Sequence, residues 1–205
     1  MVFEELYTKR RIIKINIHFR YNFNVNLIVL DSRNGGVKIN DLSEFYPTRT
    51  PVWWARRGLV ELDLDEPGVT GRLIVIRIWK EFHNLRGFRK IFQNLEKLMF
   101  KITGGPKVLR RPLDDMNSLL WELSNGFRTF REICKILDDV FAEHIHPVEE
   151  RTAMALRQFE SLGFIVMLKE KFDQSWLNGP GLNNLENPLP DPDPKLGLDW
   201  SPLEE

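Results

Sequence analysis

The feature that most constrains the fold is a run of three short helical segments with clear ends, between residues 114 and 163. Asp114 is a good N-cap, and Gly126 lies where the first segment needs a residue with positive φ beyond its end. Thr129 opens the second segment with the Thr-x-x-Glu spacing of a capping box. Pro147 lies in the first turn of the third segment, and Gly163 ends it. The pattern predicts three consecutive helices joined by short connections.

Apolar residues recur in each segment at spacings of three and four, which is the period of one helix face. Each helix is therefore expected to bury one side. The inward residues are predicted to be Met116, Leu119, Leu120 and Leu123 in the first helix, Phe130, Ile133, Leu137, Val140 and Phe141 in the second, and Val148, Thr152, Ala155, Leu156 and Phe159 in the third.

Strand patterns precede the helices. Residues 52–54 and the alternating segment 59–64 are followed by the turn 66–68 and by a β-rich run at 73–79, so the simplest expectation is two paired strands. A Gly-Gly-Pro break then leads into a further short strand at 107–111. A short apolar strand or extended exit is expected at residues 164–168, after the third helix.

Three other segments complete the predicted organisation. Residues 1–49 form a β-rich N-terminal extension with runs at 11–19 and 23–30, which is either a hairpin or a segment outside the domain. The main domain is expected at residues 50–170, with an inserted amphipathic helix at about 84–100. Pro, Asn and Asp dominate residues 171–205, so this tail is predicted to be largely irregular. The fold class is therefore α+β.

Composition excludes several classes of protein. Lys plus Arg (29) equals Asp plus Glu (29), so no overall positive field attracts nucleic acid or anionic lipid. No window approaches the roughly 20 apolar residues of a membrane-spanning helix. Cys134 is the only cysteine, which excludes an intramolecular disulfide and favours a reducing cytoplasm. A secretory signal is not expected, because no apolar stretch follows the N-terminal charges.

The segment 119–133 reads Leu-Leu-Trp-Glu-Leu-Ser-Asn-Gly-Phe-Arg-Thr-Phe-Arg-Glu-Ile. It resembles the signature of the PqqD-like family, the pyrroloquinoline quinone synthesis protein D-like peptide recognition elements. That signature has an apolar residue, Trp, Leu, Asp-Gly, Arg or Lys-Thr and then Glu-Ile, and Asn125 here replaces the usual Asp. The similarity continues to Leu162-Gly163-Phe164-Ile165 and covers residues 112–168.

The resemblance implies a winged-helix-like fold, in which a small antiparallel sheet is followed by three helices. It also implies a non-catalytic module that binds the leader of a precursor peptide. In the family, the leader is added as a strand along the open sheet edge, beside the third helix. Strand addition is physically sensible, because main-chain hydrogen bonds give affinity and side-chain pockets give selectivity. The implied partner is a separate modifying enzyme, such as a radical enzyme of a peptide-derived cofactor or natural-product pathway.

Candidate binding residues follow from the same resemblance, on the short strand and on the third helix. Charges at Lys107, Arg110 and Arg111 would attract an acidic leader. A plain solvated surface is the alternative explanation for the helix positions. The candidates are Val108 and Arg110 on the strand, and Arg151, Met154, Arg157 and Gln158 on the helix.

No catalytic, metal or cofactor site is predicted. His144 and His146 are separated by one residue but lack an evident third ligand, so a solvated loop is the better interpretation. Cys134 has no activating motif around it, and core packing is expected instead. Adjacent acids such as Asp138 and Asp139 point about 100° apart on a helix and do not converge.

Two other functions stay open. A winged-helix outline is shared with nucleic-acid-binding proteins, although Glu149, Glu150 and Glu160 offset the basic residues of the third helix. A scaffold subunit of a larger enzyme is the second alternative. The tail could also fold back into the peptide groove through apolar residues such as Leu189 and Trp200, but its prolines would interrupt strand pairing.

Overall fold

The computed structural model describes residues 42–60, 62, 64–80, 107–172, 178–183 and 187–202. The chain divides into two compact units: the first comprises residues 1–50 and 119–176, and the second comprises residues 51–118 and 177–205. The strands expected at 11–19 and 23–30 and the helix expected at 84–100 lie outside the described residues.

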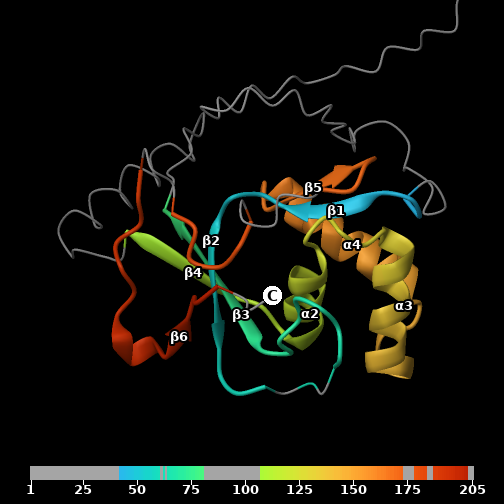
Figure 1. The fold of residues 1–205 in the computed structure, drawn as a ribbon, viewed down its shortest axis with the longest axis horizontal. Coiled ribbons are helices and arrows are strands. Elements are labelled where there is room, and N and C mark those ends of the chain that lie inside the picture. Colours follow the sequence, from blue (N-terminus) through green and yellow to red (C-terminus); the bar gives the residue numbers. More distant parts are fainter. Residues whose placement is uncertain are drawn as a thin grey trace, which may run out of the picture. The chain divides into compact units, whose positions relative to one another are not determined.

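The described chain is α+β, as predicted, with antiparallel strands followed in sequence by helices (Figure 1). In chain order, the elements are β1 Tyr46–Arg49, β2 Trp53–Arg57, β3 Leu73–Trp79, β4 Val108–Pro112, α2 Asp115–Leu123, α3 Phe130–Phe141, η2 Ala142–Ile145, α4 Val148–Ser161, β5 Ile165–Leu168, η4 Pro194–Leu196 and β6 Leu198–Asp199.

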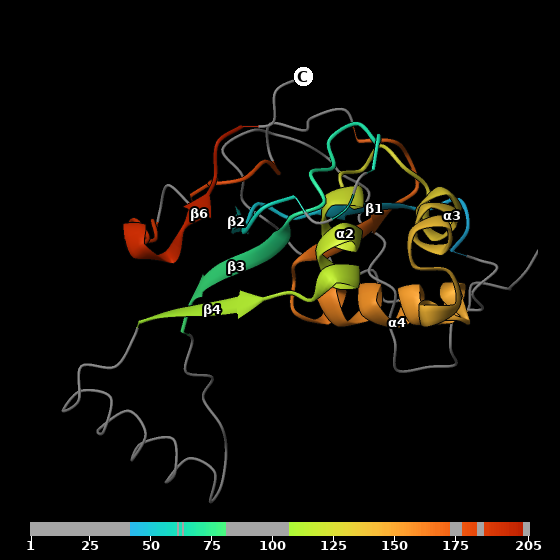
Figure 2. The same cartoon turned by 90° about the horizontal axis from the view of Figure 1, so that it is seen from below.

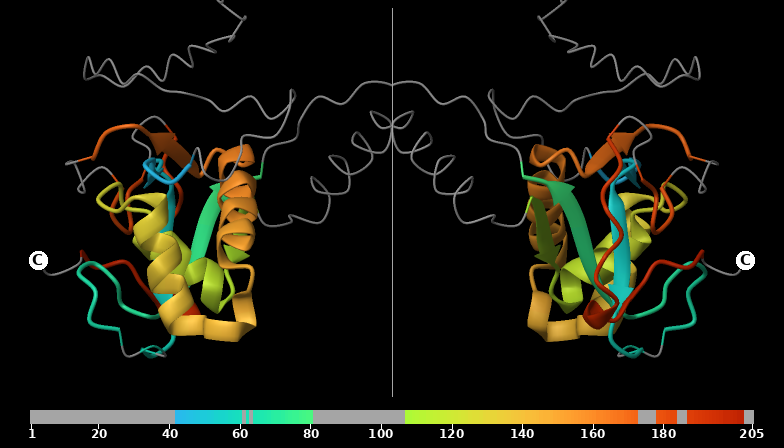
Figure 3. Two further views of the ribbon diagram at one scale, coloured as in Figure 1. Left: turned by 90° about the vertical axis from the view of Figure 1, so that its right-hand side faces the viewer. Right: turned by 90° about the vertical axis from the view of Figure 1, so that its left-hand side faces the viewer.

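The helix ends follow the local capping chemistry of the sequence. Asp114 Oδ1 accepts a hydrogen bond from Asn117 N at 2.8 Å, as an N-cap does for α2. The capping box of α3 is complete: Thr129 Oγ1 accepts from Glu132 N at 3.3 Å, and Glu132 Oε2 accepts from Thr129 N at 2.7 Å. Figure 3 shows α3 leading through η2 into α4. The three predicted helices are therefore confirmed.

A strand that the sequence analysis did not identify belongs to the first unit. β1 pairs antiparallel with β5, from Tyr46 opposite Leu168 to Arg49 opposite Ile165. The last residues of the predicted N-terminal extension are thus part of the fold. The predicted boundary near residue 50 coincides instead with the division between the two units.

Arg49 connects β1 to the end of α2 through hydrogen bonds. Its main-chain N donates to Ser124 O at 2.9 Å, and its Nη1 donates to Trp121 O at 3.1 Å. Burial lowers the pKa of Arg49 to about 10, against the opposing effect of Glu122. Because a buried cation is costly without partners, this side chain fixes where β1 meets the helix.

The aromatic core of the first unit surrounds Trp121, which is fully buried. Phe159 of α4 and Phe164 contact its ring edge-on, with centroid distances of 5.8 and 6.3 Å. Such edge-to-face arrangements are favoured by the quadrupoles of the rings. Trp121 therefore packs the core, as its place in the helical pattern predicts.

The second unit contains a four-stranded antiparallel sheet in the order β4-β3-β2-β6 (Figure 2). β2 and β3 pair as expected for the runs at 52–54 and 73–79, but the alternating segment at 59–64 forms no strand among its described residues. Gly58 has a φ of +78° and follows the end of β2, and Leu59 beyond it is 86% exposed.

Gly126 is the point where three segments of the first unit meet. Its φ is +87°, its N donates to Pro47 O at 3.0 Å, and its O accepts from Phe172 N at 3.0 Å. A Cβ added here would lie 2.6 Å from Phe172 Cβ and 2.8 Å from Thr48 Oγ1. Glycine is required both for the backbone conformation and for the close approach.

We predict that Gly126→Ala destabilises the protein by about 1–2 kcal/mol more than Gly163→Ala, because strain and steric overlap act together. Gly163 is the matched control: its φ is +72°, but nothing lies within 4 Å of an added Cβ. Urea denaturation of both variants measures the difference. Equal destabilisation would show that the close approach contributes nothing.

Candidate functional site

The candidate site is the free side of β4, the terminal strand of the sheet. Lys80 N donates to Lys107 O at 2.8 Å, and Leu113 N donates to Ile74 O at 2.9 Å. Main-chain groups of an antiparallel strand point alternately toward and away from the partner strand. Residues 107, 109, 111 and 113 therefore face β3, whereas residues 108, 110 and 112 face away from it.

The outward groups of β4 have no strand beside them among the described residues, since β4 ends the sheet order. Val108 and Arg110 each present an N–H and a C=O group. Pro112 presents only a C=O group, because proline has no N–H. The edge therefore offers a short pairing surface, and the proline limits its extension at one end.

The side chains along this edge are basic on both faces of the sheet. Lys107, Arg110 and Arg111 are all exposed, and no acidic residue lies within β4. Arg110 lies opposite Arg77, and Val108 opposite Trp79. Val108 and Trp79 pack against a small apolar cluster of Trp53, Ala55 and Leu189.

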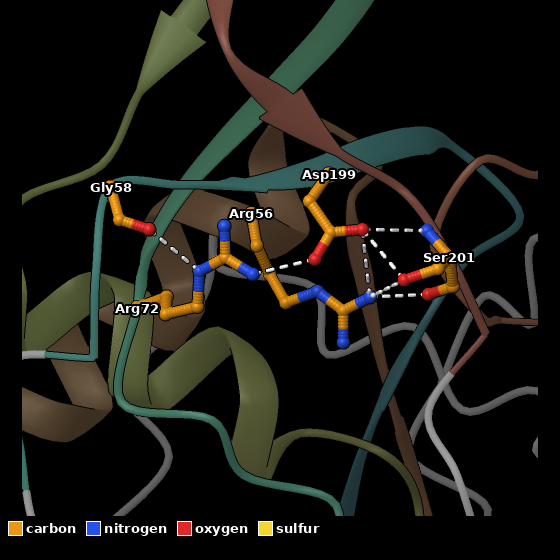
Figure 4. A network of polar contacts seen from close by, with 5 residues as sticks. All are labelled: Arg56, Gly58, Arg72, Asp199 and Ser201. Atoms are coloured by element: carbon orange, nitrogen blue, oxygen red, sulfur yellow. Dashed lines mark hydrogen bonds and ion pairs between the residues drawn. The ribbon is translucent and has the colours of Figure 1, made fainter.

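The opposite edge of the sheet is closed by the C-terminal tail. β6 pairs antiparallel with β2, with Arg56 opposite Asp199. Figure 4 shows the network that anchors it: Arg72 Nη1 donates to Asp199 Oδ2 at 2.5 Å, and Ser201 Oγ donates to Oδ1 at 2.6 Å. The buried Arg56 guanidinium donates to Ser201 O and lies 3.6 Å from Asp199 Oδ1. Hydrogen bonds from Ser201, then a hydrogen bond from Arg72 and the charge of Arg56, lower the pKa of Asp199 to about 2.

The tail also covers one face of the sheet. We call residues 187–202 the C-terminal strap. Trp79 Nε1 donates to Asn187 O at 3.0 Å, Arg77 Nη2 donates to Pro190 O at 2.7 Å, and Trp200 packs against Trp53 at a centroid distance of 6.0 Å. The tail is mostly irregular, as predicted, but its pairing with β2 was not anticipated.

The predicted helix positions lie on the exposed side of α4, in the first unit. Met154 is 69% exposed, and Arg151 Nη1 donates to His144 O at 3.1 Å. Val108 and Arg110 belong to the second unit, so the two sets of candidate residues are described separately. The exposed helix positions are Arg151, Met154, Arg157 and Gln158.

Sequence reasoning missed Arg77, and it considered the tail only as a possible occupant of the peptide groove, not as the strap that covers one face of the sheet. A signal was present: Arg77 interrupts an otherwise apolar strand, and Leu189, Leu198 and Trp200 recur in the tail. Neither pattern predicts which segments contact each other, because the contacts join residues more than a hundred positions apart.

Groups suited to metal binding do not gather among the described residues. No cluster of three or more His, Cys, Asp or Glu side chains could hold a metal ion in that part of the chain. His146 Nε2 lies 3.5 Å from Asp138 Oδ1, and both side chains are solvated. Within the same residues, no helix is long and apolar enough to cross a membrane.

Cys134 is buried in α3, as core packing requires. Burial raises the pKa of its thiol to about 12, and the charge of Glu149 acts in the same direction. Because the thiolate is the reactive form, this cysteine is a poor nucleophile in the folded protein.

Comparisons with family models, with curated proteins and with solved structures found no match for this chain. The similarity of residues 112–168 to the PqqD-like signature therefore remains an interpretation of the sequence.

We predict that Cys134 reacts with a soluble disulfide reagent at mildly alkaline pH only after the protein unfolds. Absorbance would follow the released thiol in buffer and in concentrated urea, with free cysteine as the control. Prompt reaction in buffer would contradict the burial and the raised pKa.

We predict that Asp199→Asn loosens the strap and lowers stability by about 1 kcal/mol, a value reduced for partial solvent exposure. Since the pKa of Asp199 is lowered from 3.8 to about 2, its stabilising effect is full above pH 3.8 and is lost as pH falls toward 2. Limited proteolysis of the tail and acid titration of stability measure both effects. Asp65→Asn is the control, because Asp65 is exposed and makes no hydrogen bond to a described residue.

Proposed function

We propose that this protein binds a peptide as an added strand on the β4 edge and presents it to a separate modifying enzyme. The observation that carries the proposal is the terminal position of β4, with the main-chain groups of Val108 and Arg110 facing away from β3. An extended peptide can satisfy these groups through the pairing that joins β4 to β3.

The closure of the other edge supports the same assignment. β6 already occupies the free side of β2 and is itself only two residues long, so β4 is the longer free edge of the described sheet. Basic residues along β4 favour a peptide with acidic character. The resemblance of residues 112–168 to peptide recognition elements adds an independent reason.

Main-chain pairing alone gives limited affinity. Val108 and Arg110 together offer four hydrogen bonds, each contributing roughly 0.5–1.5 kcal/mol. That sum is comparable to or smaller than the cost of association. Selective binding therefore needs contacts from side chains along β4, such as those of Val108 and Arg110.

The test begins with a displayed library of random dodecapeptides selected against the whole protein. An enriched peptide should slow hydrogen exchange of the outward amides of Val108 and Arg110 in the isotope-labelled protein. If no peptide is enriched, or if protection falls elsewhere and β4 is unaffected, the proposal is wrong.

We predict that Arg110→Pro raises the Kd of the enriched peptide about tenfold above that of Arg110→Ala. Both variants lose the guanidinium, but only proline removes the outward N–H and adds a ring on the edge. Proline is tolerated where the N–H faces solvent, so both should fold. Fluorescence anisotropy gives the Kd, and thermal unfolding checks the fold. Equal affinities of the two variants for the peptide would show that the peptide does not bind through main-chain pairing at β4.

A further inference from the structure

Two arginines face each other across the last two strands of the sheet. Arg77 of β3 lies directly opposite Arg110 of β4, so both side chains lie on the same face. Like charges in this arrangement repel each other. Burial, and then the charge of Arg110, lower the pKa of Arg77, while Asp191 of the strap acts in the opposite direction.

The two guanidinium groups differ in their burial and in their hydrogen bonds. Arg77 is 4% exposed, stacks over Trp53 at 4.4 Å from the ring centroid and donates to Pro190 O. Its Nη1 is buried without a hydrogen bond to a described residue. Arg110 is exposed, and it forms neither a hydrogen bond nor an ion pair with any described residue. The outer guanidinium therefore has room for an anion.

An added strand would place its side chains in register with this face. The peptide residue paired with Arg110 has its side chain beside the guanidinium, on the face shared with Arg77. The residue two positions away pairs with Val108, which packs with Trp79 against the apolar cluster. The edge thus presents a basic position next to an apolar one.

We propose that the bound peptide carries a carboxylate opposite Arg110 and an apolar side chain two residues away, opposite Val108. This deepens the peptide-binding proposal and rests on it. The carboxylate offsets the repulsion between Arg77 and Arg110, and the apolar residue extends the cluster beside Trp79. The two positions therefore select acidic–x–apolar segments, in which one residue separates the acidic and the apolar residue. Which of the two comes first depends on the direction in which the peptide strand is added.

The experiment compares dodecapeptides enriched from the random library by the wild-type protein, by Arg110→Glu and by Arg111→Glu. Arg111 is the matched control, because it is exposed on the same strand but lies on the opposite face with its main chain toward β3. Thermal unfolding confirms that each variant is folded. The wild type and Arg111→Glu should enrich Asp or Glu two positions from an apolar residue, and Arg110→Glu should replace the acid by Lys or Arg.

The affinity of one peptide enriched by the wild-type protein is then measured. Changing its acid to the matching amide should weaken binding to the wild type about threefold, with little effect on binding to Arg110→Glu. Reversing both charges should restore the affinity.

The outcomes separate the two proposals. Peptides that protect β4 but show no acid at a fixed position, or that are unchanged by Arg110→Glu, overturn the acidic–x–apolar rule and leave strand addition standing. A change caused equally by Arg111→Glu overturns the rule in favour of a general charge effect. Failure of every variant to enrich a peptide overturns both proposals.

Discussion

Main-chain hydrogen bonding at the two sides of the four-stranded sheet is the constraint from which the candidate site follows. An open strand edge is exposed to uncontrolled pairing unless it is covered, charged or shortened. The free side of β2 is covered, because β6 pairs with it and Gly181 N donates to Trp54 O at 2.9 Å. The β4 side is instead charged and ends at Pro112. β4 is therefore a short, basic free edge of the sheet.

Buried arginines determine which distant segments meet in each unit. Arg49 donates to Trp121 O in the first unit, whereas Arg56 donates to Ser201 O and Arg77 to Pro190 O in the second. Each guanidinium is thus held by a main-chain carbonyl from a remote part of the chain. Buried charges need such partners, so these contacts are specific as well as stabilising.

The same arginines explain which parts of the fold the sequence could predict. Helix ends depend on residues within four positions of one another, so Asp114, Thr129 and Gly126 could be interpreted from the sequence alone. β1 could not, because its buried positions include Arg49, which has the polarity of a surface residue, and its partner β5 lies more than a hundred residues away. β6 has only two residues and depends on Asp199 meeting Arg56 and Arg72.

The sequence predicted that the candidate site is a strand, but it could not predict that this strand lies at the edge of the sheet. The Gly-Gly-Pro break and the residues after it predicted β4, yet its terminal position depends on β3 pairing with β2 on one side and with β4 on the other. The signature at 119–133 cannot supply that information, since Trp121 packs a core, Gly126 permits a close approach and Thr129 caps a helix. A chain could keep all three while its strand edge differs. Under the proposed function, selectivity would depend on edge residues such as Val108 and Arg110, whose environment is set by the tail as well as by β4 itself.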